Sequence, residues 1–312
     1  MGEIHELVIR HGQKAARDMV GPSRRLQVDI AAEVLADEAQ RMGITYSGFC
    51  LTGFPHKRLP DEMPWEKSGH NVTLLVEPGR LKVGPGPSVL FGVPYGARAR
   101  IIMIYLQTQA VRTGGRQVQL GRSMRDWMTR MGVASGGETA KALREQARRI
   151  TACHLRFFWS ATDEDGRRGD GFRQGGIVSD GFFFRKEETE EDRQGTLFED
   201  MVTLDEAFYD ALRRHPVPLL ETAIRELQAK SLALDLYVWL AYRLHSLKQP
   251  TGVSWLSLFA QFGTGFKLAR QFKPYFIDAL GAAIAAYPDA RVSIESDGII
   301  MYPSRPPIAK AG

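Results

Sequence analysis

The sequence predicts a helix-rich α+β fold with two tandem winged-helix domains, each a helix-turn-helix followed by a β-hairpin. Two observations lead to this prediction: the order of helical and strand-like patterns from residue 97 to residue 185, and the return of that order 130 to 136 residues later. A third observation, a concentrated positive charge, indicates the kind of ligand. We expect an irregular N-terminal region at 1–90, a first winged-helix domain at 91–202 and a second at 203–312.

The first domain is predicted from three helical patterns and a hairpin. Glycine-containing turns separate the helices, and Ser123 is placed to act as the N-cap of the second one. A strand, a charged glycine-rich tip and a second strand then follow in the order typical of a winged helix. The expected helices are 97–111, 123–131 and 138–151, and the expected hairpin has strands at 155–159 and 181–185 with a tip at 163–176.

The second half of the chain repeats this order with different residues. Each half has an apolar helix, a short tryptophan-containing helix that closes at a glycine, a longer helix and a hairpin. The letters differ, so the repeat is one of pattern, and it predicts a duplicated supersecondary unit. The corresponding segments of the second half are 234–244, 253–263, 268–286 and the hairpin 291–302.

The segments around the two domains have weaker patterns. A helix is expected from residue 23 to Gly43, and residues 48–96 hold eight glycines and seven prolines, which predicts turns and short strands. The acidic stretch 187–200 is expected to be a linker or an exposed loop. Three helical segments are expected after it, at 204–214, 219–228 and 232–247.

Positive charge is concentrated between residues 80 and 158, where the chain has 14 Lys and Arg but 3 Asp and Glu. The local charge of +11 exceeds the +5 of the whole chain, and residues 159–202 carry −6. Because solvated surfaces usually mix both signs, this bias predicts a phosphate-binding surface, with nucleic acid as the first hypothesis.

The helix 138–151 is the predicted DNA-reading element of the first domain, because the second helix of a helix-turn-helix enters the major groove. Lys141, Arg144 and Arg148 follow each other at i, i+3 and i+7 and therefore share a face. The preceding helix begins where backbone phosphates are usually contacted. The predicted DNA-binding residues are Arg122, Arg125, Lys141, Arg144, Gln146, Arg148 and Arg149, with Arg167, Arg168 and Arg173 at the hairpin tip, where a solvated tip is the alternative.

The second domain has a weaker basic face, since residues 203–312 carry a net charge of +2. Its third helix begins with cations and an amide, and Pro274 beside them predicts a kink or a first-turn position. DNA contact is expected here too. The residues predicted to make it are Lys267, Arg270, Gln271 and Lys273.

Motifs of catalysis are missing from the sequence. The string GPGPS at 84–88 lacks the lysine of a phosphate-binding P-loop, and the seven histidines are scattered without a metal-binding pair. Asp163, Glu164 and Asp165 resemble a metal-binding cluster by count, but a solvated hairpin tip is the simpler interpretation. We therefore expect a protein with no enzymatic activity, no cofactor and no metal.

The composition indicates the compartment. No apolar run approaches the roughly 18 residues of a membrane span, and the first ten residues lack the apolar core of a secretory signal. Cys50 and Cys153 are expected to be buried or half-buried thiols. The sequence therefore predicts a cytoplasmic protein without a membrane partner.

Six strings between residues 52 and 308 are distinctive: TGFPHKRLP (52–60), GVPYGARARIIMIYLQTQAVRTG (92–114), LGRSMRDWMTRMG (120–132), SLALDLYVWLAYRLH (231–245), VSWLSLFAQFG (253–263) and PSRPPI (303–308). These strings resemble the plasmid-encoded RepA replication-initiator family. The resemblance covers roughly residues 50–308, and residues 1–50 match less clearly. It implies a bacterial plasmid protein that binds repeated sites (iterons) at its origin. It also implies duplex opening, recruitment of the host replication initiator and replicative helicase, and paired winged-helix domains.

Two other functions stay open at this point. A transcriptional repressor, acting on its own gene, would need the same DNA-binding domains without initiator activity. A metal-dependent nuclease or primase would depend on Asp163, Glu164 and Asp165. The sequence also leaves open whether the monomer or a homodimer binds double-stranded origin DNA.

Overall fold

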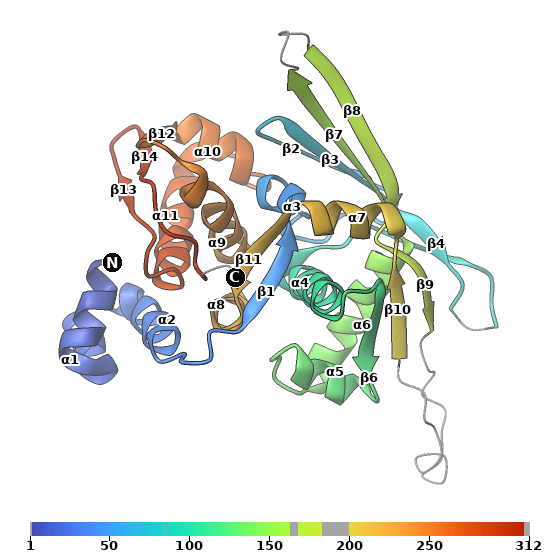
Figure 1. Cartoon of the computed structure of the whole chain (residues 1–312), viewed down its shortest axis with the longest axis horizontal. Helices are drawn as coiled ribbons and strands as arrows, with labels where there is room; N and C mark the ends of the chain where they lie inside the picture. The colour runs from blue at the N-terminus through green and yellow to red at the C-terminus, as the bar shows by residue number, and fades with distance from the viewer. Residues whose placement is uncertain (1, 84, 163–167, 183–199, 309–312) are drawn as a thin grey trace.

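A computed structural model describes residues 2–83, 85–162, 168–182 and 200–308, in which helices and small antiparallel sheets alternate (Figure 1). The fold class is as predicted: a helix-rich α+β chain with two winged-helix modules. The described helices include none that is long and apolar enough to cross a membrane.

The chain begins with a helical arm. Helix α1 (Glu3–Met19) breaks at Gly12, whose φ of 75° is a backbone conformation that glycine adopts readily. The short helix η1 (Pro22–Arg24) and helix α2 (Arg25–Leu35) follow, and α2 packs against helices of the second half of the chain. In Figure 1 the arm lies beside that half, at the lower left.

The first module contains the predicted helix-turn-helix. Helix α4 (Gly96–Thr113) ends at Gly114, whose φ of 68° is left-handed, and strand β6 (Gln117–Gly121) follows. Next come helices α5 (Met124–Arg130) and α6 (Gly137–Ala152). The three helices predicted from periodicity are confirmed.

The hairpin of the first module is paired differently from the prediction, which was wrong. Strand β7 (His154–Thr162) pairs with β8 (Arg168–Gly176), so the expected glycine-rich tip is largely a strand. Strand β9 (Val178–Phe182) pairs with β10 (Asp200–Leu204), and β10 pairs with β6. The three-stranded sheet β6-β10-β9 is therefore the winged-helix sheet of this module, and its wing is the β9–β10 hairpin.

The glycines of β8 explain the error. A Cβ atom at Gly171 would lie 2.5 Å from the Trp159 ring on the paired strand, so this glycine allows a close approach rather than a turn. The predicted linker or loop at 187–200 lies outside the described residues, except for Asp200, which begins β10.

The β7–β8 hairpin belongs to a second, four-stranded sheet with the order β2-β3-β7-β8. Its other strands, β2 (Trp65–Gly69) and β3 (Val72–Glu77), come from the glycine- and proline-rich region. In Figure 1 this sheet projects from the top of the molecule. Strands β4 (Gly79–Leu81) and β5 (Val89–Phe91) form a separate pair beside it.

Another small sheet connects the two halves of the chain. Strand β1 (Met42–Tyr46) pairs with β11 (Pro216–Leu220), and helix α3 (Ser47–Leu51) follows β1. The helix predicted at 219–228 is helix α8 (Glu221–Leu227), with residues 219–220 in strand β11 instead, and α7 (Glu206–Arg214) is as predicted.

The second module repeats the architecture of the first. Its sheet order β12-β14-β13 matches β6-β10-β9, and α9, α10 and α11 correspond to α4, α5 and α6. The repeat predicted from the sequence pattern is confirmed. Its elements are α9 (Ser231–Arg243), η3 (Leu244–Ser246), β12 (Thr251–Ser254), α10 (Trp255–Phe262), α11 (Ala269–Ala285), β13 (Val292–Ile294) and β14 (Gly298–Met301).

One contiguous apolar core runs through both modules and includes the buried face of α9 and the buried side of α4. Cys50 and Cys153 are free and buried in it, as predicted. The domain boundaries at residues 90 and 202 stay predictions; the second falls inside strand β10.

Candidate nucleic-acid interface

The helix-turn-helix of the first module is held by short-range contacts. Ser123 caps α5 as predicted, since its side chain accepts a hydrogen bond from the backbone N–H of Asp126 at 3.1 Å. Trp127 and Met128 face the core, and the Trp127 ring meets Tyr105 of α4 edge to face. Gly132, with φ of 67°, then turns the chain toward α6.

The outward face of α6 presents three cations. Lys141, Arg144 and Arg148 are exposed, whereas Leu143 and Ile150 on the opposite side are buried. We call these three residues the α6 cations. None of them has a hydrogen-bond or ion-pair partner among the described residues, so their charge is available to a ligand. Arg122 and Arg125, before and within α5, are also exposed.

Much of the remaining positive charge between residues 80 and 158 is used inside the protein. Arg100 and Arg149 are buried, and several of the other cations lie in short ion pairs or donate hydrogen bonds to carbonyl oxygens. The charge of +11 therefore overstates the free charge, which the α6 cations carry together with a few neighbours. Those other pairs are Arg112–Glu221 at 2.8 Å, Arg130–Asp126 at 3.1 Å and Arg156–Glu77 at 3.1 Å.

Gln146 and Arg149 are corrections to the predicted interface. Gln146 is 3% exposed, because it shares the inward stripe of Leu143 and Ile150, and its Oε1 accepts a hydrogen bond from the Tyr95 backbone at 2.8 Å. Arg149 is 1% exposed. Both side chains pack inside the module and do not reach the exposed face of α6.

Arg149 is the centre of a buried polar cluster. It donates to Asp61 at 2.6 Å and to Glu145 at 2.7 Å, and its guanidinium lies 5.3 Å from the centre of the Tyr95 ring. A buried guanidinium needs partners of this kind to offset the loss of hydration. The cluster joins α6 to the loops around residues 61 and 95.

The arginines predicted at the hairpin tip are not brought to the wing. Arg167 lies outside the described residues, and Arg168 begins β8. Arg173 is in the middle of β8, opposite Phe157, and its guanidinium lies 5.9 Å from the centre of the Trp159 ring. Arg173 is therefore a strand residue of the projecting sheet.

In the second module, Lys267, Arg270 and Gln271 are exposed at the beginning of α11. Lys273 is half-buried: its Nζ lies 4.4 Å from the centre of the Trp255 ring and donates to the carbonyl oxygen of Ser296 at 3.4 Å. Lys273 thus joins α11 to the turn of the β13–β14 hairpin. Pro274 lies in the second turn of a helix that continues to Ala285.

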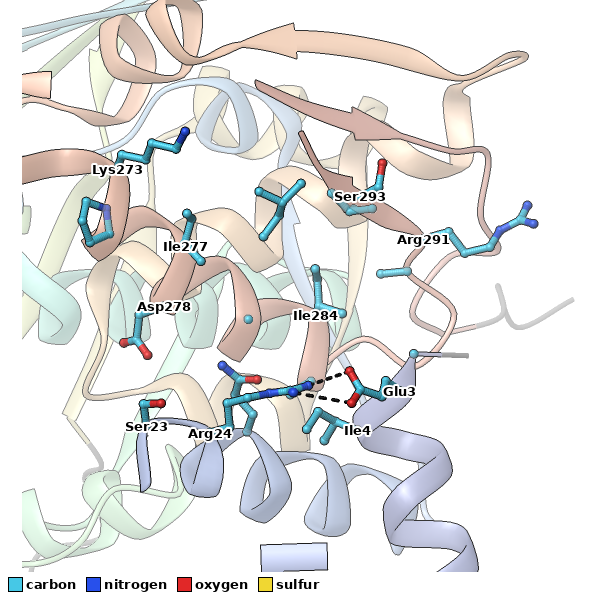
Figure 2. A pocket seen from close by; sticks show the side chains of 18 of the residues that line it. Glu3, Ile4, Ser23, Arg24, Lys273, Ile277, Asp278, Ile284, Arg291 and Ser293 are labelled. Carbon is cyan, nitrogen blue, oxygen red and sulfur yellow. Dashed lines mark hydrogen bonds and ion pairs between the residues drawn. The ribbon is translucent and has the colours of Figure 1, made fainter. Parts of the chain in front are cut away.

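A groove of about 1430 Å³ separates the N-terminal arm from the second module (Figure 2). One face of α11 and strand β13 line it. The start of α1, helix η1 and the start of α2 lie opposite, and an ion pair of 2.9 Å joins Arg24 of η1 to Glu3 of α1. Arg270 and Lys273 are among the lining residues. The N-terminal arm and β13 therefore lie beside the face of α11 that carries Arg270 and Lys273. A DNA-reading helix would leave this face exposed to solvent.

Residues that could hold a metal are not grouped in the described parts of the chain, where no cluster of three or more His, Cys, Asp or Glu side chains occurs. The acidic cluster Asp163, Glu164 and Asp165, the candidate for metal chemistry, lies outside the described residues.

Comparison with protein families agrees with the module that carries the α6 cations. The family described as plasmid encoded RepA protein matches residues 93–256, which is more than half of the chain. The chain belongs to this RepA family. The match runs from the start of α4 through the helix-turn-helix to α10. Family membership supports a role as a plasmid replication initiator.

Solved structures of RctB domains are similar to this RepA-family chain, and no curated protein matches it. A selenomethionine crystal structure of domains 2 and 3 of RctB has a TM-score of 0.51 at 14% identity, covering 82% of this chain and 94% of that one. A structure of RctB residues 155–483 has a TM-score of 0.48 at 12% identity, covering 79% of this chain and 91% of that one. At such low identity, the first of these matches shows the fold.

Proposed function

We propose that this RepA-family protein binds iteron-type repeats in double-stranded DNA at its plasmid origin, with helix α6 in the major groove. The α6 cations support the proposal: they are exposed, share one face, occupy the reading helix of a winged-helix module and lack partners among the described residues. Arg122 and Arg125 would contact the backbone phosphates beside the groove.

The second module would add a smaller contribution to the same complex. Lys267, Arg270 and Gln271 would contact DNA from the start of α11, whereas Lys273 would act through the hairpin turn that it holds. The contrast between an open α6 and a flanked α11 supports this ranking. Duplex opening would then come from binding energy used to bend and unstack DNA.

The protein would act by binding rather than by catalysis, in the bacterial cytoplasm, and would recruit the host initiator and replicative helicase to the opened origin. The repressor alternative uses the same interface, so DNA binding alone does not separate the two functions. The two functions are separated by whether plasmid replication depends on the α6 cations.

The experiment combines a footprint with a replication assay. The purified protein should protect a periodic array at its plasmid origin, and a plasmid encoding the R144A/R148A variant should fail to replicate. Protection of a promoter without any loss of replication would favour the repressor. Metal-dependent nicking of the origin by the wild-type protein would instead favour a nuclease.

A further inference from the structure

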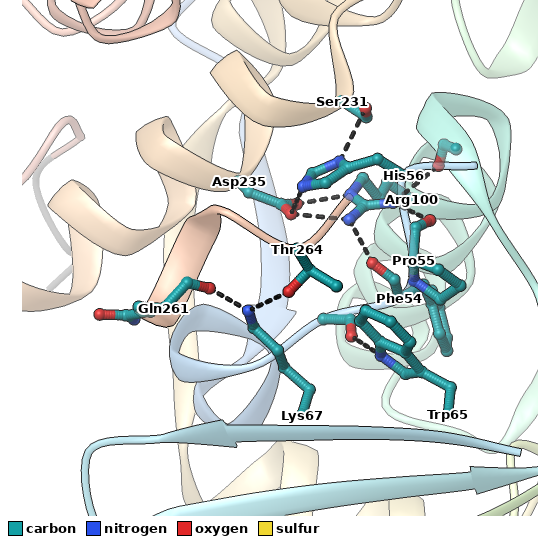
Figure 3. Close-up of polar contacts among 12 residues, drawn as sticks. Phe54, Pro55, His56, Trp65, Lys67, Arg100, Ser231, Asp235, Gln261 and Thr264 are labelled. Atoms are coloured by element: carbon teal, nitrogen blue, oxygen red, sulfur yellow. Dashed lines mark hydrogen bonds and ion pairs between the residues drawn. The ribbon is translucent and has the colours of Figure 1, made fainter. Parts of the chain in front are cut away.

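The two modules are joined by a buried polar cluster around the segment 52–67 (Figure 3). Arg100 of α4 is 6% exposed and donates to Asp235 of α9 at 2.5 Å from Nε and 2.7 Å from an Nη atom. The same guanidinium donates to the carbonyl oxygens of Phe54 at 2.7 Å and Gly96 at 2.9 Å. One side chain thus connects the first module, the segment 52–67 and the second module.

Two further residues of that segment contact the second module. The Nδ1 atom of His56 lies 2.9 Å from the Ser231 hydroxyl at the start of α9, and its Nε2 lies 3.8 Å from Asp235. The Nζ atom of Lys67, on β2, donates to the carbonyl oxygen of Gln261 and to the Thr264 hydroxyl. Gln261 and Thr264 lie at the end of α10 and in the turn before α11, so Lys67 holds the helix-turn-helix of the second module.

The environment of this cluster is poorly hydrated. Burial, followed by the charge of Arg100, lowers the pKa of His56 to about 4, and burial lowers the pKa of Lys67 to about 8. His56 is therefore neutral at physiological pH. It hydrogen-bonds to Ser231 and lies beside the charged side chains of Arg100 and Asp235. Hydrogen bonds in such a setting have strict geometry, because a displaced partner would leave a buried charge unpaired.

We propose that Arg100, Asp235, His56, Ser231 and Lys67 form a clamp that fixes the separation of α6 and α11 and makes the protein selective for the spacing of its two DNA contacts. This inference rests on the proposed function, in which both helices face one DNA site. The residues of the clamp are positioning residues, since they contact neither DNA-reading face. A loosened clamp would leave each module folded but would widen the range of helix separations.

The first test needs no DNA. Spin labels on E138C in α6 and Q271C in α11 report the separation of the two helices; Cys50 and Cys153 are buried and do not interfere. We expect a narrow distance distribution in the wild-type background and a broader one in K67M and in D235N. K67M keeps the buried stem of the lysine, so it provides a mild variant if D235N fails to fold. E77Q, which breaks the Arg156 ion pair within one sheet, is the matched control.

The second test uses origin duplexes in which the two halves of one footprint are moved apart by 5 base pairs. This insertion places the halves on opposite sides of the helix, because one turn is about 10.5 base pairs. We expect the wild-type protein and E77Q to lose roughly 10- to 100-fold in affinity. K67M and D235N should bind the natural site more weakly and lose less than about 3-fold on insertion.

A narrow distance distribution in a folded clamp variant, or a wild-type spacing penalty in that variant, would overturn the clamp. An affinity of the wild-type protein that does not change on insertion would also overturn the clamp. A wild-type protein that does not bind its origin at all would instead contradict the proposed function, while the distance measurement would still decide whether the clamp orders the two modules.

Discussion

Arg100 and Asp235 occupy the fifth position of equivalent helices, α4 and α9, and pair through two hydrogen bonds of 2.5 and 2.7 Å. The repeated unit thus carries a cation in one copy and a carboxylate in the other, at a point where the two copies meet. The pair gives the tandem modules a defined mutual placement, which independent winged helices joined by a linker would lack.

The stability of the protein should fall as the pH drops from 6.5 to 4, because of His56. The unfolded chain binds a proton at His56 near pH 6.5, whereas burial keeps the folded form neutral down to about pH 4. The unfolded state therefore gains protons first, and the free energy of unfolding decreases by about 3 kcal/mol across that window. Urea unfolding at several pH values measures this loss. The free energy of unfolding of H56Q should vary less with pH than that of the wild type. Equal slopes in the two proteins would contradict this assignment.

Arg149 should matter for stability and not for DNA contact. R149M removes the charge that Asp61 and Glu145 share in a buried site, and we expect a loss of roughly 2–4 kcal/mol in the free energy of unfolding. Chemical denaturation measures the loss. The salt dependence of DNA binding in the folded variant should equal that of the wild type; a flatter dependence would return Arg149 to the interface.

Removal of residues 203–312 should prevent folding of the remainder. The cut divides strand β10 and removes β11, the partner of β1, together with α9, which packs against α3 and α4. We expect an insoluble product or one without a cooperative thermal transition. A soluble fragment with such a transition would show that the first module folds alone and that the shared core is dispensable.

The sequence predicted helices more accurately than strand pairing. Apolar periodicity located α4, α5 and α6, and the Ser123 cap is a local signal. Pairing of β9 with β10 joins strands separated by residues 183–199, and no local pattern reports such a contact. Gly171 resembled a turn residue, although its role is to make room for Trp159.

The exposure of the candidate interface residues was predicted in part. Lys141, Arg144 and Arg148 lie on the outward face that their spacing indicates, whereas Gln146 and Arg149 are polar residues at inward positions. The spacing of Gln146 from Leu143 and Ile150 was a usable signal for burial, because it places all three on one stripe. The sequence signal for the Arg100–Asp235 pair is weaker: the two residues have opposite charges and are separated by the 130 to 136 residues that separate the two repeats.

The salt dependence of origin binding by R144A/R148A decides whether helix α6 lies in the DNA interface. The slope of log K against log salt should flatten by up to about 2 units relative to the wild type, because two cations that lie against the DNA, and up to two phosphate contacts, are lost. R214A/K248A, which removes two exposed cations outside both helix-turn-helix units, should keep the wild-type slope. Unchanged affinity and slope in R144A/R148A would remove α6 from the DNA interface and contradict the account.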